Sequence, residues 1–179
     1  VEVTGTVNFG ANAVCQALNH EKHVLLYNLE LDATLGPILK KRALQNGVMI
    51  SGGDGDQPGA IMNLYRFLKN IGMIPLVCGN IKGLEDHYRT PTTQKSFAKR
   101  WGLRVKPVTS YADGSKISFE QAAVANATGM GVATRGMLGY HSDQHIDLLK
   151  NLYDHQKIKA MGGIVDYVVG AKPGPGVYV

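Results

Sequence analysis

Strand-sized apolar segments alternate with helix-like segments over the first 50 residues, and this alternation constrains the fold more than any other feature. Residues 1–4, 23–27 and 48–50 are short apolar runs of strand length. Between them, residues 12–19 and 34–45 carry apolar side chains at helical spacing. The strand–helix–strand–helix–strand order predicts a parallel sheet with crossover helices, and therefore an α/β fold.

The remainder of the chain has a less regular pattern. A glycine-rich loop over residues 51–59 leads into a helix, and Asp56 is placed to cap the N-terminus of that helix. Periodic and apolar segments predict helices at 59–71, 92–101, 119–127 and 143–154, and extended segments at 73–78, 105–111 and 164–169. Segments 79–91 and 128–139 are predicted as loops. We therefore expect a mixed α+β domain after the parallel unit.

Composition excludes several classes of protein. Hydrophobic residues make up 44% of the 179 residues, which is enough for a core and too many for a disordered chain. No apolar run approaches the ~20 residues that cross a bilayer, so we expect no membrane partner. Cys15 and Cys78 form neither a disulfide framework nor a zinc spacing, which fits a reducing, cytoplasmic compartment.

The positive charge of the chain is modest and diffuse. The formal net charge is +5, and the basic residues gather only at 40–42 and 99–106. Because no aromatic platform is evident beside either cluster, we expect no nucleic-acid partner. This modest positive charge is better suited to attracting an anionic small-molecule substrate.

Both ends of the sequence are strand-like. The chain opens on Val1 within an apolar run and stops at Val179 in another. We therefore expect a piece of a longer protein.

Several short motifs occur in an informative order. The chain opens with a strand ending in Thr4-Gly5, and after a helix the next strand ends at Asn28. Further motifs follow in sequence at 28–37, 55–60, 113–116, 125–129 and 163–170. Together they resemble the homoserine dehydrogenase-like family of oxidoreductases, which includes the deoxyxylulose-phosphate-reductoisomerase-like enzymes that are often fused to a SAF domain. The segment Asn28-Leu29-Glu30 is similar to the Asn-Lys-Glu of true reductoisomerases, with Leu29 in place of the lysine.

The resemblance implies an NAD(P)-dependent oxidoreductase acting on a small carbonyl or hydroxy metabolite, by homoserine dehydrogenase-like or reductoisomerase-like hydride transfer. Residues 1–28 would be the C-terminal part of a Rossmann domain, and 29–179 a mixed α+β catalytic domain that also dimerises, so a homo-oligomer is expected. Thr4, Gly5 and Asn28 would line the cofactor side.

A complete phosphate-binding fingerprint is missing. Gly129-Met130-Gly131 lacks the third glycine, and Gly53-Asp54-Gly55 fails the spacing. We therefore expect the cofactor-binding half upstream of Val1, and this fragment alone to be inactive. A non-catalytic substrate-binding or dimerisation module without its own cofactor site is the alternative.

Carboxylates follow successive predicted strands. Glu30, Asp32, Asp54 and Asp56 come after two of them, so they are expected to converge at one edge of the sheet. Converging carboxylates bind divalent cations or tune one another for proton transfer. We therefore predict a catalytic role for Asp56, and a substrate or metal (Mg/Mn) site at Glu30 and Asp54. Helix capping explains Asp32 and Asp56 equally well.

Two loop lysines are candidates for proton transfer. Reduction of a carbonyl needs a proton donor near the developing alkoxide, and Lys82 and Lys116 fit this role. A solvated loop lysine is the plain alternative for each. Asp113, Asn126 and Arg135 are predicted to contact substrate, although Asn126 is as readily explained by a structural hydrogen bond.

Other polar residues are given structural roles. Glu120 is predicted to do no more than favour the N-terminus of its helix. His141 and His145 are four residues apart, a spacing known from metal sites, and they are expected to be surface or packing residues.

Overall fold

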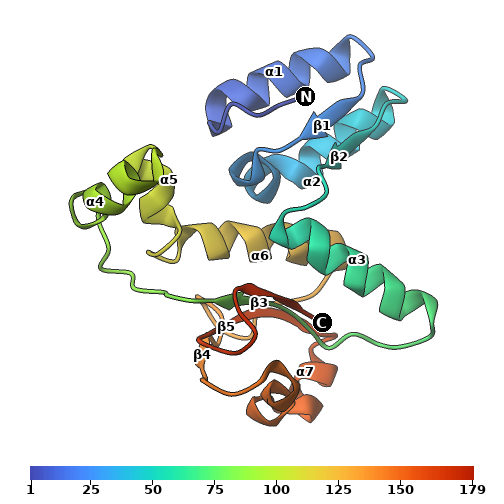
Figure 1. The fold of residues 1–179 in the computed structure, drawn as a ribbon. Helices are drawn as coiled ribbons and strands as arrows, with labels where there is room; N and C mark the ends of the chain where they lie inside the picture. Colours follow the sequence, from blue (N-terminus) through green and yellow to red (C-terminus); the bar gives the residue numbers. More distant parts are fainter.

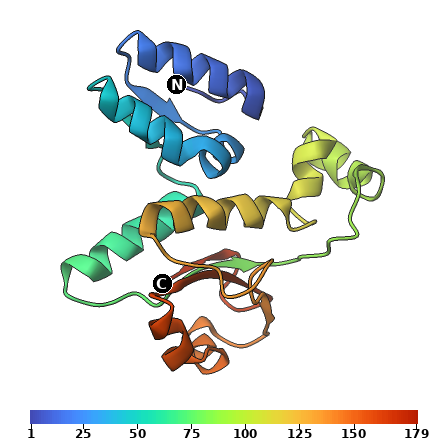
Figure 2. The same ribbon diagram turned by 180° about the vertical axis from the view of Figure 1, so that it is seen from behind.

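The computed structural model describes residues 1–179 and shows a mixed α/β architecture in stacked layers (Figure 1). The first layer holds α1 (Val7–Asn19), β1 (Val24–Leu26), α2 (Leu29–Gln45) and β2 (Ile50–Gly52). The middle layer holds α3 (Gln57–Asn70) and α6 (Ser115–Thr128), which run side by side in both views (Figure 2). Below them lies a sheet of β3 (Val77–Lys82), β4 (Tyr140–His141), β5 (Ile164–Val169) and β6 (Gly176–Tyr178), flanked by the 3-10 helix η1 (Ile146–Leu152) and α7 (His155–Ala160).

The first layer confirms the predicted parallel unit. β1 and β2 are parallel, and residue Glu2 forms a parallel bridge with Leu26 on the other side of β1. The predicted strand at residues 1–4 is therefore reduced to this single bridge. Helix α2 begins earlier than predicted, because Asn28 caps it by accepting a hydrogen bond from the Leu31 N–H. Asp32, for which capping was the alternative role, lies inside the helix.

The lower sheet has the order β4-β5-β3-β6, with β3 parallel to β5 and antiparallel to β6. The strand predicted at 73–78 is displaced toward the C-terminus, and 79–82 is a strand rather than a loop. Pro75 has no N–H for a sheet, so pairing starts after it. Because β3 has a partner on each side, the hydrogen bonds of the ladder outweigh the poor strand propensity of Gly79 and Asn80.

Helices α4 (Pro91–Trp101) and α5 (Val105–Ser110) form an arm beside the layers (Figure 1). The prediction that 105–111 is extended is wrong, because residues 105–110 form a helix that packs against α4, and Val108 of this helix is fully buried. Gly102 ends α4 in the left-handed conformation, as expected from the sequence. Phe97 lies 5.8 Å from the guanidinium of Arg100, so an aromatic side chain does accompany this basic cluster.

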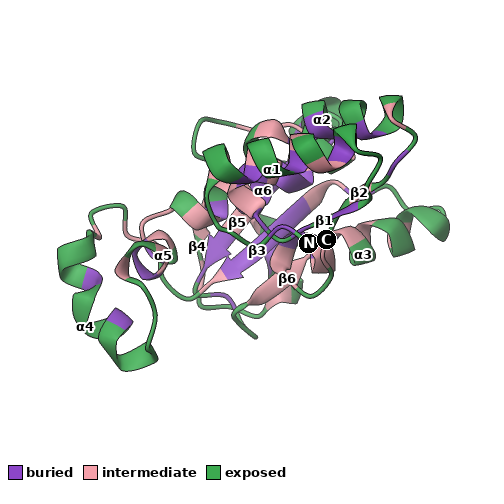
Figure 3. Cartoon of the chain, turned by 90° about the horizontal axis from the view of Figure 1, so that it is seen from above, coloured by how far each residue is buried: buried purple, intermediate pink, exposed green.

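The apolar core is divided between the layers. One cluster, from Val14 to Val48, fills the first layer, and a second joins Ile61 and Val124 to the sheet. Buried residues concentrate along β3 and β5, whereas α4 is mostly exposed (Figure 3). None of the helices combines the length and apolar character needed to cross a bilayer.

Candidate functional site

A pocket of about 410 Å³ opens between the N-terminal segment and helices α5 and α6. Its polar lining comes from Gly5, Thr6, Asn28, Glu30, Arg104, Lys106, Ser110, Tyr111 and Lys116. Three cations face one carboxylate in this set, so we call it the basic pocket. It brings together four residues predicted from three separate motifs, namely Gly5, Asn28, Glu30 and Lys116.

Asn28 shapes one wall of the basic pocket. The side chain is buried, donates a hydrogen bond to the Thr6 carbonyl at 3.0 Å and accepts one from the Leu31 N–H at 3.3 Å. It therefore ties the turn at Gly5 to the start of α2. Gly5 has a φ of +66°, and a Cβ on it would point toward the Arg104 guanidinium. The absence of a side chain at Gly5 leaves this part of the pocket open.

A buried ionic cluster stands behind the basic pocket. The carboxylate of Glu120, on α6, is fully buried. Its Oε1 lies 3.4 Å from the Lys116 ammonium and its Oε2 lies 3.9 Å from the Lys82 ammonium, on β3. The Asn80 amide donates to Oε2 at 3.0 Å. We call these four residues the Glu120 cluster.

The charges in this cluster are mutually dependent. Burial raises the pKa of Glu120, and the two lysines oppose that rise. Burial also lowers the pKa of Lys82, Glu120 acts against this, and the positive charge of Lys116 adds to it. The Lys116 ammonium is further held 4.8 Å from the centre of the Tyr111 ring. The arrangement presents a positive, proton-bearing group to the pocket.

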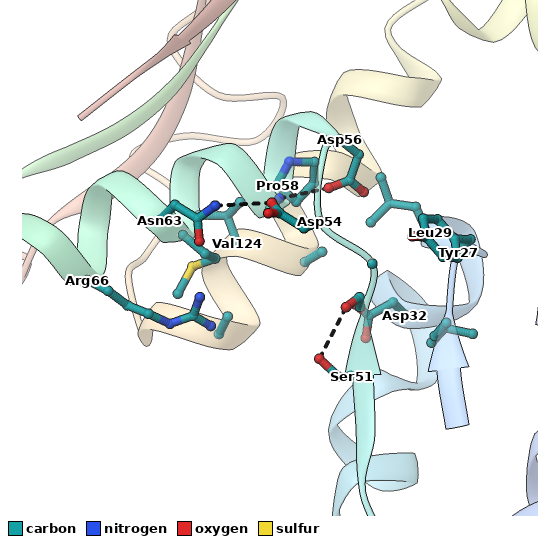
Figure 4. Close-up of a pocket in the computed structure, with 17 residues that line it drawn as sticks. Tyr27, Leu29, Asp32, Ser51, Asp54, Asp56, Pro58, Asn63, Arg66 and Val124 are labelled. Carbon is teal, nitrogen blue, oxygen red and sulfur yellow. Dashed lines mark hydrogen bonds between the residues drawn. The ribbon is translucent and has the colours of Figure 1, made fainter. Parts of the chain in front are cut away.

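A second pocket, of about 340 Å³, lies at the carboxyl ends of β1 and β2 (Figure 4). Asp32, Asp54 and Asp56 line it, so we call it the acidic pocket. Asp56 caps α3 by accepting the Gly59 N–H at 2.8 Å, as the sequence predicted. Asp54 accepts a hydrogen bond from the Asn63 amide. The pKa of Asp32 is raised, first by burial and then by the charge of Asp56.

The carboxylates predicted to converge are divided between the two pockets. Glu30 lines the basic pocket, and Asp54 lines the acidic pocket. No group of three or more histidine, cysteine, aspartate or glutamate side chains is arranged to hold a metal ion. The structure therefore does not bring Glu30 and Asp54 together as a metal site.

Four other predicted residues lie outside both pockets. Thr4 bonds to the Glu2 carboxylate, and Asp113 accepts the Ser115 N–H at the start of α6. Asn126 donates to the Ala33 carbonyl and so connects α6 to α2, which matches the structural alternative for this residue. Arg135 is exposed in the glycine-rich loop. None of these four contributes a side chain to the basic pocket.

The role predicted for Glu120 is wrong. Helix α6 begins at Ser115, not at Phe119, so Glu120 lies in its second turn and faces β3 instead of the helix terminus. The signal in the sequence was the spacing of four residues between Lys116 and Glu120, which places both on one helix face. Asn80 and the arm residues Arg104 and Lys106 were also missed. Asn80 was assigned to a loop, and the arm was not expected to reach the site.

Comparison with protein families gives a match to the larger part of the chain. A family model described as "Oxidoreductase DRL, catalytic domain" matches residues 55–179, which is well over half of the chain. No curated protein matches the chain. The matched segment carries the whole Glu120 cluster, whereas Gly5, Asn28 and Glu30 precede it.

Proposed function

The chain belongs to the oxidoreductase DRL catalytic-domain family, and from this premise we propose that it forms the substrate site of an NAD(P)-dependent oxidoreductase acting on a small carbonyl or hydroxy metabolite. The reaction would be a hydride transfer of the homoserine dehydrogenase-like or reductoisomerase-like kind. One observation carries the proposal: Gly5 and Asn28, from the segment before the family match, share a pocket with Lys116 from within it.

The residues at the pocket entrance fit a nicotinamide cofactor. Gly5 leaves open the space that a side chain would fill, and Arg104 and Lys106 add positive charge to the same wall. Thr6 offers a hydroxyl beside them. When bound, the cofactor supplies or accepts the hydride. The Nδ2 and Oδ1 atoms of Asn28 are both used in hydrogen bonds to the backbone. The role of Asn28 is therefore to position the backbone that lines the pocket.

Lys116 is the proposed proton donor to the substrate oxygen. It lines the pocket, and Glu120 and Tyr111 hold its ammonium in place. Reduction of a carbonyl creates an alkoxide, and a fixed ammonium both stabilises that charge and donates the proton. Lys82 stands behind it, across the Glu120 carboxylate. The reverse reaction would return the proton to the same lysine.

Glu30 and Asp54 line different pockets, which does not fit a divalent cation bound between them, so no step of the proposed reaction uses a metal ion.

We also propose that the first domain ends near residue 53 instead of after residue 28. The apolar cluster of the first layer includes Leu39 and Val48, and the family match begins at residue 55.

The test is a redox assay on the natural full-length protein. We expect NADH or NADPH to be consumed with an aldehyde or ketone, with homoserine and deoxyxylulose phosphate as the first metabolites to try in the two directions. Lys116→Ala should lower turnover by about 100-fold or more, since about 100-fold is the lower end of the range for a lost general acid. Lys95→Ala, on the exposed face of α4, is the control. No reaction with either nicotinamide cofactor would contradict the proposal.

A further inference from the structure

A fully buried carboxylate between two ammonium groups is unusual outside a functional site, because desolvating charges is costly unless they compensate one another. Glu120 has no exposure, and the side chains of Lys82 and Lys116 are 13% and 29% exposed. The Asn80 amide fixes Oε2, so the carboxylate cannot turn freely. Each carboxylate oxygen therefore faces its own lysine.

We propose that Glu120 is the positioning residue of the site: its carboxylate holds the Lys116 ammonium at the wall of the basic pocket and is the counter-charge of the Lys82 ammonium behind that wall. The inference rests on the proposed function only for what the lysines do in the reaction.

Three charged side chains influence the carboxylate of Glu120. Lys116 comes from its own helix, Lys82 from β3, and Asp56 from the start of α3. Without the carboxylate, two positive charges would share a partly buried space with no counter-charge between them. Lys82, the less exposed of the two, would then lose its proton more readily, because burial already lowers its pKa. The lysine facing substrate would also lose the contact that fixes its direction.

The charges of Glu120 and Lys116 act on the pKa of Lys82 in opposite directions. Removing the negative charge of Glu120 should make Lys82 titrate at lower pH, and removing the positive charge of Lys116 should make it titrate at higher pH. A role limited to packing would not produce shifts of opposite sign. Glu120→Gln keeps the side-chain volume and an oxygen for Asn80, so it removes the charge and little else.

The experiment is an NMR titration of the chain labelled with ¹³C at lysine Cε, with Lys82 assigned by the signal lost in Lys82→Met. We expect Lys82 to titrate at lower pH in Glu120→Gln than in the parent protein, and at higher pH in Lys116→Gln. Glu120→Asp should recover part of the parent behaviour. Glu30→Gln is the matched control, because it removes a carboxylate that lines the basic pocket and is not paired with Lys82 or Lys116.

An unchanged Lys82 titration in Glu120→Gln would overturn the inference. If Glu120→Gln does not fold, Glu120→Asp takes its place, because it draws the carboxylate away from the lysines; a Lys82 titration identical to that of the parent protein would then overturn the inference. The titration needs no substrate or cofactor, so its result is independent of the redox assay. Shifts of the expected sign in a protein without nicotinamide activity would support the role of Glu120 and contradict the proposed reaction.

Discussion

The side-chain amide of Asn80 donates a hydrogen bond of 3.0 Å to the carboxylate of Glu120, and through it strand β3 is joined to helix α6. Both side chains are buried, and they lie 40 positions apart in the sequence. The bond is a polar contact between two layers that also meet through the Gln121 amide on the Asp166 carbonyl and through apolar side chains such as Val124 and Cys78. Stability and site geometry therefore depend on the same pair.

Asn80→Val should destabilise the protein by about 2 kcal/mol, since a hydrogen bond to a charged group is lost while the buried carboxylate remains. Valine suits a β-strand, so the loss reports the bond and not strand propensity. Urea unfolding measures it. Asn63→Val, which removes an exposed amide bond to Asp54, should change stability by less than about 0.5 kcal/mol. Equal losses in the two variants would contradict this account.

Gly79→Ala should destabilise the lower sheet. A Cβ at Gly79, in the middle of β3, would overlap the Tyr178 ring of the neighbouring β6. The ring must then move, and its hydroxyl would lose the 2.7 Å hydrogen bond to the Tyr153 hydroxyl. We expect a cost of about 1–3 kcal/mol, typical of overpacking. Gly83→Ala, just past the strand with open space around it, should be nearly neutral in the same thermal melts.

Asp56→Ala should cost about 1 kcal/mol of stability, because it removes the N-cap of α3. Asp56→Ser retains a capping oxygen and should keep the stability of the parent. Since Asp56 lines the acidic pocket and not the basic one, we also expect Asp56→Ser to keep most of the redox turnover. A stable Asp56→Ser protein that is inactive would instead give this carboxylate the catalytic role suggested by the sequence.

Asp166 should make the protein less stable as the pH rises. Burial raises the pKa of this carboxyl, although the N–H groups of Gly139 and Leu138 act in the opposite direction. The folded state therefore binds a proton at pH values where the unfolded chain has released it. Its contribution to stability is complete below the ordinary aspartate range and is lost as the pH rises through the folded pKa.

Asp166→Asn should flatten this part of the stability profile, because the amide oxygen can still accept the two N–H bonds without carrying a charge. Chemical unfolding at a series of pH values measures the effect. Asp143→Asn, an exposed aspartate on the same domain, serves as the control and should leave the profile unchanged. A profile that keeps its slope in Asp166→Asn would show that another group is responsible.

Local signals in the sequence predicted several elements correctly. Asp56 caps α3, Gly102 ends α4, and residues 164–169 form a strand, because each depends on neighbours within a few positions. The prediction for residues 105–111 was wrong because their structure depends on contacts with a different element. Their β-branched side chains favour an extended chain, whereas the packing of α5 against α4 and the burial of Val108 favour the helix.

The candidate site was predicted in its parts but not in its grouping. Lys116, Asn28 and Gly5 emerged from local motifs, and the structure brings them to one pocket. The role of Glu120 was not predicted, because the role of a buried carboxylate depends on which groups face it. Asn80 and Lys82 face it from β3, and the sequence placed both in a loop.

The sequence by itself determined the parallel order of the first layer and indicated Lys82 and Lys116 as candidate proton donors, because apolar periodicity and residue chemistry are local properties. Only the tertiary structure decided that Glu30 and Asp54 lie in separate pockets and that Lys82, Asn80 and Lys116 meet at Glu120. The reason is physical. A strand or helix is specified by its neighbours along the chain, whereas a site is specified by which elements pack across it, and that depends on the burial of the whole core.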